Sequence, residues 1–238
     1  MIRTFPDPNT ADTYGLVAVS HELSTDLVLS AYHEGLFPWS DNPVGWFSPD
    51  PRAVFDFETI RMPRKDIRKV LKNNALPLRA TFDHAFSEVV AGCAKTHMQK
   101  DTSTWISKRF EQVYTELHHA GFAHSVEIWD DTTLVGGLYG IQIAGLFAGE
   151  SMFYTRTHMS KVAFAAIVGQ LKRLKIILFD AQVLNNHTEH LGAHNIPRAE
   201  YLRRLEQALQ KTSLELQPRS WRNDDAMAAI TASISLTS

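Results

Sequence analysis

The spacing of hydrophobic and polar positions predicts alternating helices and strands through most of the chain. Near the start, Ser24 or Thr25 is placed to cap a short helix that ends at Gly35. The pattern then predicts a strand over 53–57, a helix from Pro63 to about 71, a strand over 78–82, a helix from Asp83 to about 94, and a helix over 108–119, capped by Ser107 and ended by Gly121.

The second half of the chain predicts three strands followed by a helix, a strand and a helix. Strands over 123–129 and 133–139 form a hairpin, and a third strand covers 142–152. Ser160 caps a helix to about 174, which leads into a buried strand over 176–180, and a last helix covers 198–210. Residues 1–22 and the aromatic, proline-punctuated segments 36–39 and 45–52 are predicted as irregular loops, and 211–238 shows no pattern.

This order of elements predicts an α+β fold with a mixed sheet, in which helices and strands form packed layers. The series of strand, helices, antiparallel strands, helix, strand and helix matches the topology of the acetyltransferase-like (GNAT) fold. In that fold, an acyl donor lies between splayed central strands. The polar residues that end the central strands are therefore the first candidates for chemistry.

Composition and charge narrow the class of protein. The chain has 238 residues, 44% of them hydrophobic, which is enough for a sizeable core. A net charge of −2 excludes a general cationic field, so any contact with nucleic acid requires a local patch. The single cysteine, Cys93, excludes an intrachain disulfide framework. We find no signal peptide and no apolar segment of membrane length, and we expect a cytoplasmic protein.

Three polar side chains in apolar surroundings are the candidate catalytic groups. Asp180 and Gln182 end the buried strand and, being two residues apart, point to one face. Glu150 lies in a second apolar segment about thirty residues earlier. Burying a carboxylate or an amide is costly unless the group is hydrogen-bonded or used in chemistry. We expect these groups to orient an amine nucleophile on an acyl donor.

The basic segment 61–72 is a second candidate site, with six cations and one anion. On a helix its cations fall on one broad face, opposite the apolar residues. Such a face is either an ordinary solvated surface or a contact for a phosphate backbone, and the near absence of acidic residues favours the second. The predicted contact residues are Arg61, Arg64, Lys65, Arg68, Lys69 and Lys72.

Two further patterns argue against a metal site and against coenzyme A. His187, His190 and His194 are spaced like metal ligands, but Gly192 interrupts the helix and no cysteine is near, so we predict no metal and interpret His187 as a hydrogen-bonded structural residue. The segment around Ser160 contains no glycine, whereas a pyrophosphate-binding loop needs glycines that present backbone N–H groups.

An apolar set accompanies the candidate catalytic groups. Its side chains are either plain core or the walls of a pocket for an apolar ligand, and the pattern leaves both alternatives open. The set consists of Leu138, Phe147, Met152, Phe153 and Ile177.

Several segments together resemble one family, the bacterial leucyl/phenylalanyl-tRNA–protein transferases. They are 32–39 (YHEGLFPW), 46–54 (WFSPDPRAV), 104–106 (TWI), 121–129 (GFAHSVEIW), 134–140 (LVGGLYG), 149–153 (GESMF), 180–185 (DAQVLN), 187–188 (HT), 191–193 (LGA) and 196–198 (IPR). The resemblance extends from about residue 14 to about residue 205.

The resemblance implies a small N-terminal domain, residues 1–53, joined to a GNAT-like domain, residues 54–238. It implies transfer of Leu or Phe, and weakly Met, from aminoacyl-tRNA to proteins whose N-terminus is Arg or Lys. The product is a peptide bond and an N-degron. The implied partners are Leu-tRNA, Phe-tRNA and such acceptor proteins. The resemblance implies no cofactor and no metal, because the donor ester arrives activated. The lack of an apolar segment of membrane length predicts no membrane partner.

Aminolysis of an ester then assigns a role to each candidate. Asp180 is expected to orient the amine or take its proton. Gln182 is expected to position the amine or the ester, and Glu150 to bind the donor amine or the cationic end of the acceptor. Trp39 and Trp105 are expected to stack on the terminal adenine. The other expected substrate-binding residues are Leu138, Phe147, Met152, Phe153 and Asn185.

Two alternative functions remain. The first is a coenzyme A-dependent N-acetyltransferase, which the missing glycine loop opposes. The second is a non-catalytic RNA-binding module, which rests on the basic segment alone and leaves Asp180 and Gln182 unexplained.

Overall fold

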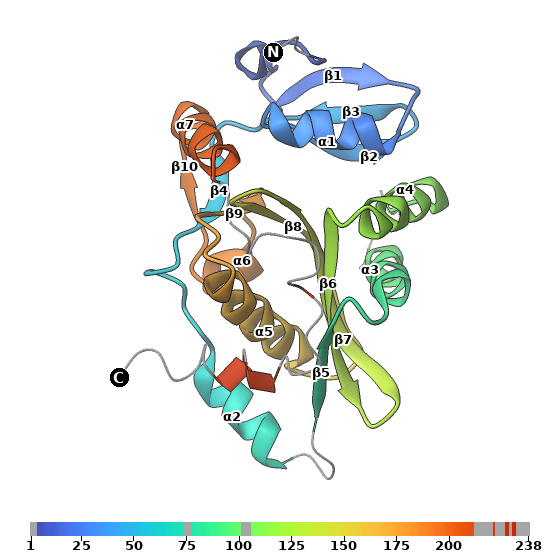
Figure 1. Cartoon of the computed structure of the whole chain (residues 1–238), viewed down its shortest axis with the longest axis vertical. Coiled ribbons are helices and arrows are strands. Elements are labelled where there is room, and N and C mark those ends of the chain that lie inside the picture. Colours follow the sequence, from blue (N-terminus) through green and yellow to red (C-terminus); the bar gives the residue numbers. More distant parts are fainter. Residues whose placement is uncertain are drawn as a thin grey trace.

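The structure is a computed structural model that describes residues 4–73, 78–100, 106–211, 221, 227, 228, 230 and 231. Figure 1 shows a small N-terminal sheet above a large sheet that is flanked by helices. The elements are η1 Pro8–Thr10, β1 Leu16–Ser20, α1 Thr25–His33, β2 Phe37–Asp41, β3 Val44–Phe47, β4 Arg52–Phe55, α2 Arg64–Asn73, β5 Arg79–Phe82, α3 Phe86–Lys100, α4 Lys108–His119, β6 Ala123–Asp130, β7 Thr133–Ile143, β8 Leu146–Tyr154, α5 Met159–Arg173, β9 Leu178–Gln182, α6 Asn186–His190, β10 His194–Ile196 and α7 Arg198–Leu209. No helix within the described ranges has the length and apolar character needed to cross a membrane.

The small sheet is antiparallel, with strand order β1-β3-β2, and α1 packs beside it. As predicted, Ser24 caps α1 by accepting a hydrogen bond from the Leu27 N–H, and Gly35 follows the helix with φ +83°. The predicted loops over 36–39 and 45–52 and the irregular segment 1–22 are wrong, because these segments contain the strands of this sheet. Pro38 suggested a loop, but it lies in the edge strand β2, where a missing N–H is tolerated.

The large sheet has the order β10-β4-β9-β8-β7-β6-β5. It is mixed, because β8 and β9 run parallel while the other neighbouring strands run antiparallel. Helix α5 covers one face with nearly all of its residues buried, and α3 and α4 cover the other (Figure 1). The predicted α+β class with a mixed sheet is therefore confirmed.

The differences between the predicted and observed strands and caps have local causes. The turn between β7 and β8 falls at Ala144 and Gly145, so the strand predicted from 142 begins at Leu146. Asp83 does not cap the following helix, because its carboxylate accepts a hydrogen bond from the Ser125 N–H at 2.8 Å. Both differences arise from strand pairing, which a local pattern does not report.

Two short elements and one cap also differ from prediction. Ser160 lies inside α5, whose N-cap is His158 with φ +71°. Helix α6 and strand β10 are too short to give a periodic pattern and were not predicted. In the C-terminal segment without a pattern, Trp221 is fully buried and stacks on His124, with 4.2 Å between ring centroids.

The parallel strands β8 and β9 separate after a short paired stretch. Residues 146–148 of β8 pair with 178–180 of β9. Beyond this stretch β8 continues to Tyr154, and we find no further pairing with β9 in this fully described part of the chain. The space between the separating strands positions the candidate site.

Candidate active site

A cavity of about 440 Å³ lies where β8 and β9 separate. Most of its walls come from β8, from β9 and the start of α6, and from the N-terminal half of α5. Single residues of β4, β7, α3 and the small sheet complete the lining. Leu138, Met152 and Phe164 contribute apolar surface, and Glu150 contributes a carboxylate. A concave, mostly apolar cavity with a few convergent polar groups is the usual form of a ligand site.

Glu150 is the centre of the polar end of the cavity. Its carboxylate accepts hydrogen bonds from the Tyr32 hydroxyl, from the Tyr114 hydroxyl at 3.1 Å and from the Gln182 amide at 3.0 Å. Burial raises the pKa of Glu150 to about 7, although these hydrogen bonds act in the opposite direction. Burial also raises the pKa of Tyr32 and Tyr114 well above its ordinary value, so both hydroxyls stay protonated. At neutral pH, Glu150 is therefore suited to take up and release a proton.

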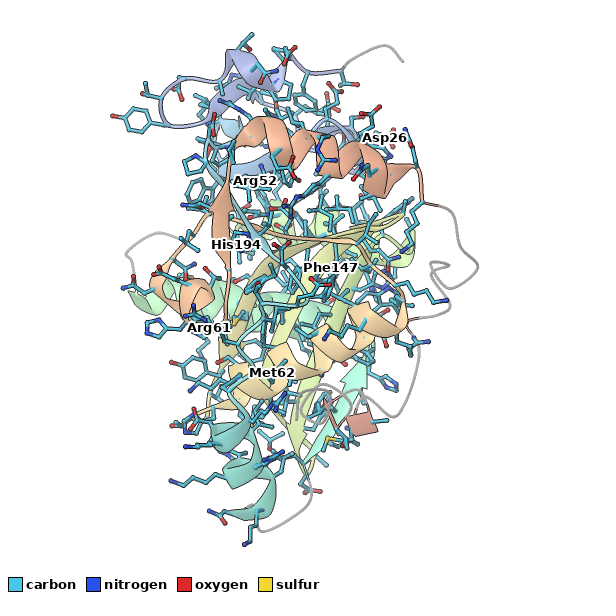
Figure 2. All side chains as sticks on the ribbon, turned by 90° about the vertical axis from the view of Figure 1, so that its left-hand side faces the viewer. Asp26, Arg52, Arg61, Met62, Phe147 and His194 are labelled. Atoms are coloured by element: carbon cyan, nitrogen blue, oxygen red, sulfur yellow. The ribbon has the colours of Figure 1, made fainter. Side chains whose placement is uncertain are left out.

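Asp180 is fully buried, and each of its two carboxylate oxygens accepts two hydrogen bonds. Arg52 donates from Nε to Oδ1 at 3.0 Å and from Nη2 to Oδ2 at 2.6 Å. The Gln182 N–H donates to Oδ1 at 2.8 Å, and the Tyr201 hydroxyl donates to Oδ2 at 2.9 Å. Arg52 is the first residue of β4 in the large sheet and lies below α7 (Figure 2). These four donors hold the carboxylate in one orientation.

Gln182 connects the two carboxylates. Its backbone has φ +63°, a left-handed conformation that costs a residue other than glycine roughly 1–2 kcal/mol. Its N–H is bound to Asp180 and its side-chain NH₂ group donates to Glu150, so both ends of the residue are fixed. With the NH₂ group directed to Glu150, the amide oxygen is left to accept a hydrogen bond from a ligand amine.

Most of the catalytic and substrate-binding residues predicted from the sequence line this one cavity. They come from both sheets and from segments more than a hundred residues apart in the chain. The predicted residues in the cavity wall are Trp39, Leu138, Glu150, Met152, Asp180, Gln182 and Asn185.

The other members of the predicted set lie elsewhere. Phe147 packs in the core against Phe179 and Trp221, and Phe153 packs on the α3 side of the sheet. Ile177 precedes β9 and is 50% exposed, away from the cavity wall. Trp105 lies outside the described residues. Of the aromatic residues that were predicted to bind substrate and that the structure describes, Trp39 lines the cavity, whereas Phe147 and Phe153 do not.

Sequence reasoning missed several residues that build the site. Tyr32 and Tyr114 occupy ordinary apolar positions of helices, and Arg52 follows a proline in a predicted loop, so no local signal marked them. Phe164 and Phe179 read as plain core and also line the cavity. Only the fold brings Tyr32 and Tyr114 to Glu150 and Arg52 to Asp180.

Asn185 and the histidines have structural contacts of their own. Asn185 caps α6 by accepting hydrogen bonds from the N–H groups of His187 and Thr188, at 2.9 and 3.0 Å. His187 lines the cavity, with its Nε2 3.2 Å from the Met152 sulfur. Within the part of the chain that the structure describes, no group of three or more His, Cys, Asp or Glu side chains is arranged to hold a metal ion.

Most of the basic segment forms α2, and most of its cationic side chains are exposed to solvent. Its single acid, Asp66, pairs with Lys161 of α5. This pair also sets α2 beside the N-terminal end of α5, whose Ser160 lines the cavity. Figure 2 shows Arg61 and Met62 at the start of this region. The exposed cations are Arg61, Lys65, Arg68, Lys69 and Lys72, and Arg64 is half-buried.

One solved structure was compared with this fold. A C-terminal DUF2156 domain from Agrobacterium fabrum aligns with 90% of this chain and 71% of its own, with a TM-score of 0.37 and 10% identity. A similarity at this level is too low to assign a shared fold.

Sequence comparison, in contrast, is decisive. The family models described as leucyl/phenylalanyl-tRNA protein transferase and as its N-terminal domain match residues 54–206 and 21–50. The leucyl/phenylalanyl-tRNA–protein transferase of Shewanella baltica (strain OS195) is 43% identical over 229 residues, which cover 94% of each chain. That of Shewanella oneidensis is 44% identical over 209 residues, which cover 86% of this chain and 87% of the relative. The chain therefore belongs to the leucyl/phenylalanyl-tRNA–protein transferase family and is an aminoacyltransferase.

Proposed function

We propose that this protein transfers Leu or Phe, and weakly Met, from aminoacyl-tRNA to the N-terminal Arg or Lys of acceptor proteins. The reaction forms a peptide bond and creates an N-degron. The observation that carries the proposal is the hydrogen-bonded pair of Glu150 and Gln182 at the polar end of an otherwise apolar cavity. Such a cavity suits an apolar side chain at one end and an ester with its attacking amine at the other.

The fold and location form part of the proposal. The large sheet is GNAT-like, which is supported by the separation of β8 and β9 at the cavity. The small sheet with α1 belongs to an N-terminal domain of residues 1–53, and residues 54–238 form the transfer domain. The matched ranges 21–50 and 54–206 support this division. The protein acts in the cytoplasm, where aminoacyl-tRNA is made.

The donor fits the apolar and aromatic walls. Leu138, Met152 and Phe164 receive the Leu or Phe side chain, whose full burial contributes about 1.5–3 kcal/mol. Trp39 is 42% exposed at the cavity wall, and its ring stacks on the terminal adenine, a contact worth roughly 1–3 kcal/mol per base. The cations of α2 contact the phosphate backbone of the tRNA.

The chemistry uses the polar end. The acceptor amine, with an unperturbed pKa of about 7.7–8.0, attacks the ester carbonyl and gives its proton to the ionised Glu150. The new C–N bond forms, the ester C–O bond breaks, and the proton passes to the leaving ribose hydroxyl. The Gln182 amide oxygen orients the amine. Asp180 orients Gln182 and does not take the proton, because its oxygens are already occupied by donors.

The direct test is transfer of labelled Leu from Leu-tRNA to two acceptor proteins that differ only in their first residue, Arg or Asp. We expect label on the Arg-initiated acceptor alone, and the same selectivity with Phe-tRNA. A parallel reaction with labelled acetyl-CoA is expected to give no transfer. Equal labelling of both acceptors, or transfer of the acetyl group, would overturn the proposal.

Neither alternative function accounts for the site as well. For an N-acetyltransferase, the segment 154–161 that opens α5 contains no glycine to present N–H groups to a pyrophosphate. For a non-catalytic RNA-binding module, α2 would suffice, and the buried arrangement of Glu150, Gln182 and Asp180 would have no purpose.

Charge reversal on α2 is expected to weaken tRNA binding and spare the chemistry. Arg64→Glu, Lys65→Glu and Arg68→Glu together remove phosphate contacts, and each lost contact lowers the slope of affinity against salt by about one unit. Transfer from an aminoacyl-adenosine donor, which lacks the acceptor stem, should survive. The measurements are tRNA affinity at several salt concentrations and turnover with both donors.

The matched control for this variant is reversal of Lys172, Arg173 and Lys175, three exposed cations at the other end of α5. It changes the net charge equally and is expected to leave tRNA affinity within about twofold of the wild-type value, since surface charges beyond a Debye length are screened. Equal losses in the two triple variants would show that α2 is no specific contact.

Tyr32→Phe is expected to shift the acid limb of the pH–rate profile upward. The Tyr32 hydroxyl donates to Glu150 and thereby lowers the pKa of that carboxyl. Without this hydrogen bond the pKa of Glu150 rises, so a smaller fraction is ionised at pH 7 and the rate there falls. The measurement is kcat/KM against pH, with Tyr201→Phe as the control, because Tyr201 donates to Asp180 and not to Glu150. A midpoint shared by wild type and Tyr32→Phe would contradict the assignment of Glu150 as base.

A further inference from the structure

Arg52 is a fully buried cation on which four elements meet. Its Nη1 donates to the carbonyl of Gly35, just beyond α1, at 3.1 Å. Its Nε and Nη2 bind both oxygens of Asp180 in β9, and Nη2 also lies 3.2 Å from the Tyr201 hydroxyl of α7. The guanidinium carbon lies over the rings of Phe37 in β2 and of Tyr201, at 4.6 and 4.3 Å from their centroids. Because guanidinium donors have a fixed planar geometry, one rigid group sets the positions of all these partners.

One branch of these contacts leads to Gln182. The Asp180 oxygen that accepts from Arg52 Nε also accepts from the Gln182 N–H. That hydrogen bond holds Gln182 at φ +63° and directs its side-chain amide to Glu150. The Gln182 backbone also pairs with Ala53 of β4, but its N–H is bound by the Asp180 carboxylate, so rotation of this carboxylate would remove the side-chain contact that supports the left-handed conformation.

The other branch leads to the small sheet. Gly35 comes just after Glu34, the C-cap of the helix that carries Tyr32, and Tyr32 donates to Glu150. Phe37 begins the strand that carries Trp39, a wall of the cavity. Arg52 therefore fixes both sides of the site relative to each other, although it does not line the cavity itself.

We propose that Arg52 is the positioning residue of the transfer site: it holds Asp180, and through Asp180 the Gln182 amide, in the geometry that aminoacyl transfer requires. This inference rests on the proposed function. Displacing a reacting group by about 1 Å can lower the rate by 10²-fold, so we expect loss of the Arg52 guanidinium to lower kcat. Lysine keeps the charge but offers no planar fork for two carboxylate oxygens, so it is not an equivalent replacement.

The competing interpretation is a buried ion pair that only stabilises the fold. Such a pair would affect melting and the amount of folded protein, and the folded fraction would turn over normally. The two interpretations therefore differ in kcat per folded molecule and in how the change is divided between kcat and KM.

The test compares Arg52→Lys with Arg198→Lys. Arg198 is a matched control, since it also joins α7 to the N-terminal part of the chain, by hydrogen bonds to the carbonyls of Pro8 and Ser48 at 2.7 and 3.0 Å, and none of its partners lines the cavity. We expect Arg52→Lys to lower kcat per folded molecule about 10²-fold, with the KM for Leu-tRNA within about threefold of wild type. Arg198→Lys is expected to keep kcat within about twofold.

A second variant removes the ion pair without leaving a buried charge. Arg52→Met combined with Asp180→Leu replaces the pair by apolar side chains, which is often neutral for stability. We expect melting near that of the wild type and a kcat reduced as in Arg52→Lys. Wild-type kcat per folded molecule in either variant would overturn the inference. A wild-type protein that transfers no Leu would instead overturn the proposed function, and the inference with it.

Discussion

Glu150→Gln is expected to lower the rate of aminoacyl transfer by about 10²–10⁴-fold, the usual contribution of a general base. Glutamine has nearly the size of glutamate, and its amide oxygen in the place of Oε1 still accepts hydrogen bonds from Tyr32 and Gln182. Its NH₂ group, in the place of Oε2, donates to the Tyr114 hydroxyl oxygen, and the amide does not take the proton of the acceptor amine. Trp39 and the apolar walls are unchanged, so the KM for Leu-tRNA should change little and the loss should appear in kcat. Single-turnover transfer at saturating Leu-tRNA measures it.

The stability of this variant provides an internal control. Burial raises the pKa of Glu150 from its ordinary 4.5 to about 7, so the folded protein binds this proton more tightly than the unfolded chain does. The resulting stabilisation is complete below about pH 4.5 and is lost as the pH rises through about 7. Glu150→Gln lacks this dependence, so its melting temperature relative to wild type should rise between about pH 5 and pH 8. An inactive variant that melts earlier than wild type at pH 8 would contradict this account.

Asp180→Ala is expected to damage both the fold and the turnover. It leaves the Arg52 guanidinium buried without its counterion, and breaking a buried pair in this way costs about 3–5 kcal/mol. It also frees the Gln182 N–H, so the molecules that remain folded should transfer Leu at a rate reduced by about 10²-fold. Denaturant unfolding gives the first quantity, and turnover divided by the folded fraction gives the second.

The control for Asp180→Ala is Asp50→Ala. Asp50 faces Arg198 at 3.6 Å, but its side chain is 50% exposed, so its ion pair is worth about 0–1 kcal/mol. We expect this variant to unfold close to wild type and to retain full turnover. If Asp180→Ala unfolded no earlier than Asp50→Ala, the buried pair would not contribute to the stability of the fold.

The sequence predicted those helices and strands that are determined by neighbouring residues, such as a helix cap or a turn. Helix α4 begins after Ser107, whose side chain accepts from the Phe110 N–H, and the hairpin of β6 and β7 follows from two strand-like segments joined by the polar turn at 130–132. Strands β2 and β3 of the small sheet were missed, because their proline and aromatic residues are also typical of loops, and only the neighbouring strand identifies them. The mixed sheet could be predicted as a class, but its strand order could not.

The same limit applies to the site. Asp180, Gln182 and Glu150 were recognisable because polar groups in apolar segments need partners. Their partners were not recognisable, since Tyr32 is 118 residues from Glu150 and Arg52 is 128 residues from Asp180. Contacts between residues so far apart in the chain produce no regular spacing that could be recognised in the sequence. The shift of the proposed base from Asp180 to Glu150 follows from these distant partners.

The rate of Leu transfer as a function of pH, in wild type and Glu150→Gln side by side, tests the central claim most directly. Deprotonation of the acceptor amine affects both proteins equally. The single-turnover rate of the wild type divided by that of Glu150→Gln therefore reports the effect of Glu150 ionisation alone. We predict that the ratio rises with pH, with a midpoint near the Glu150 pKa of about 7, and reaches a plateau of about 10²–10⁴. A ratio near one, or a large ratio that does not change with pH, would contradict proton transfer to Glu150.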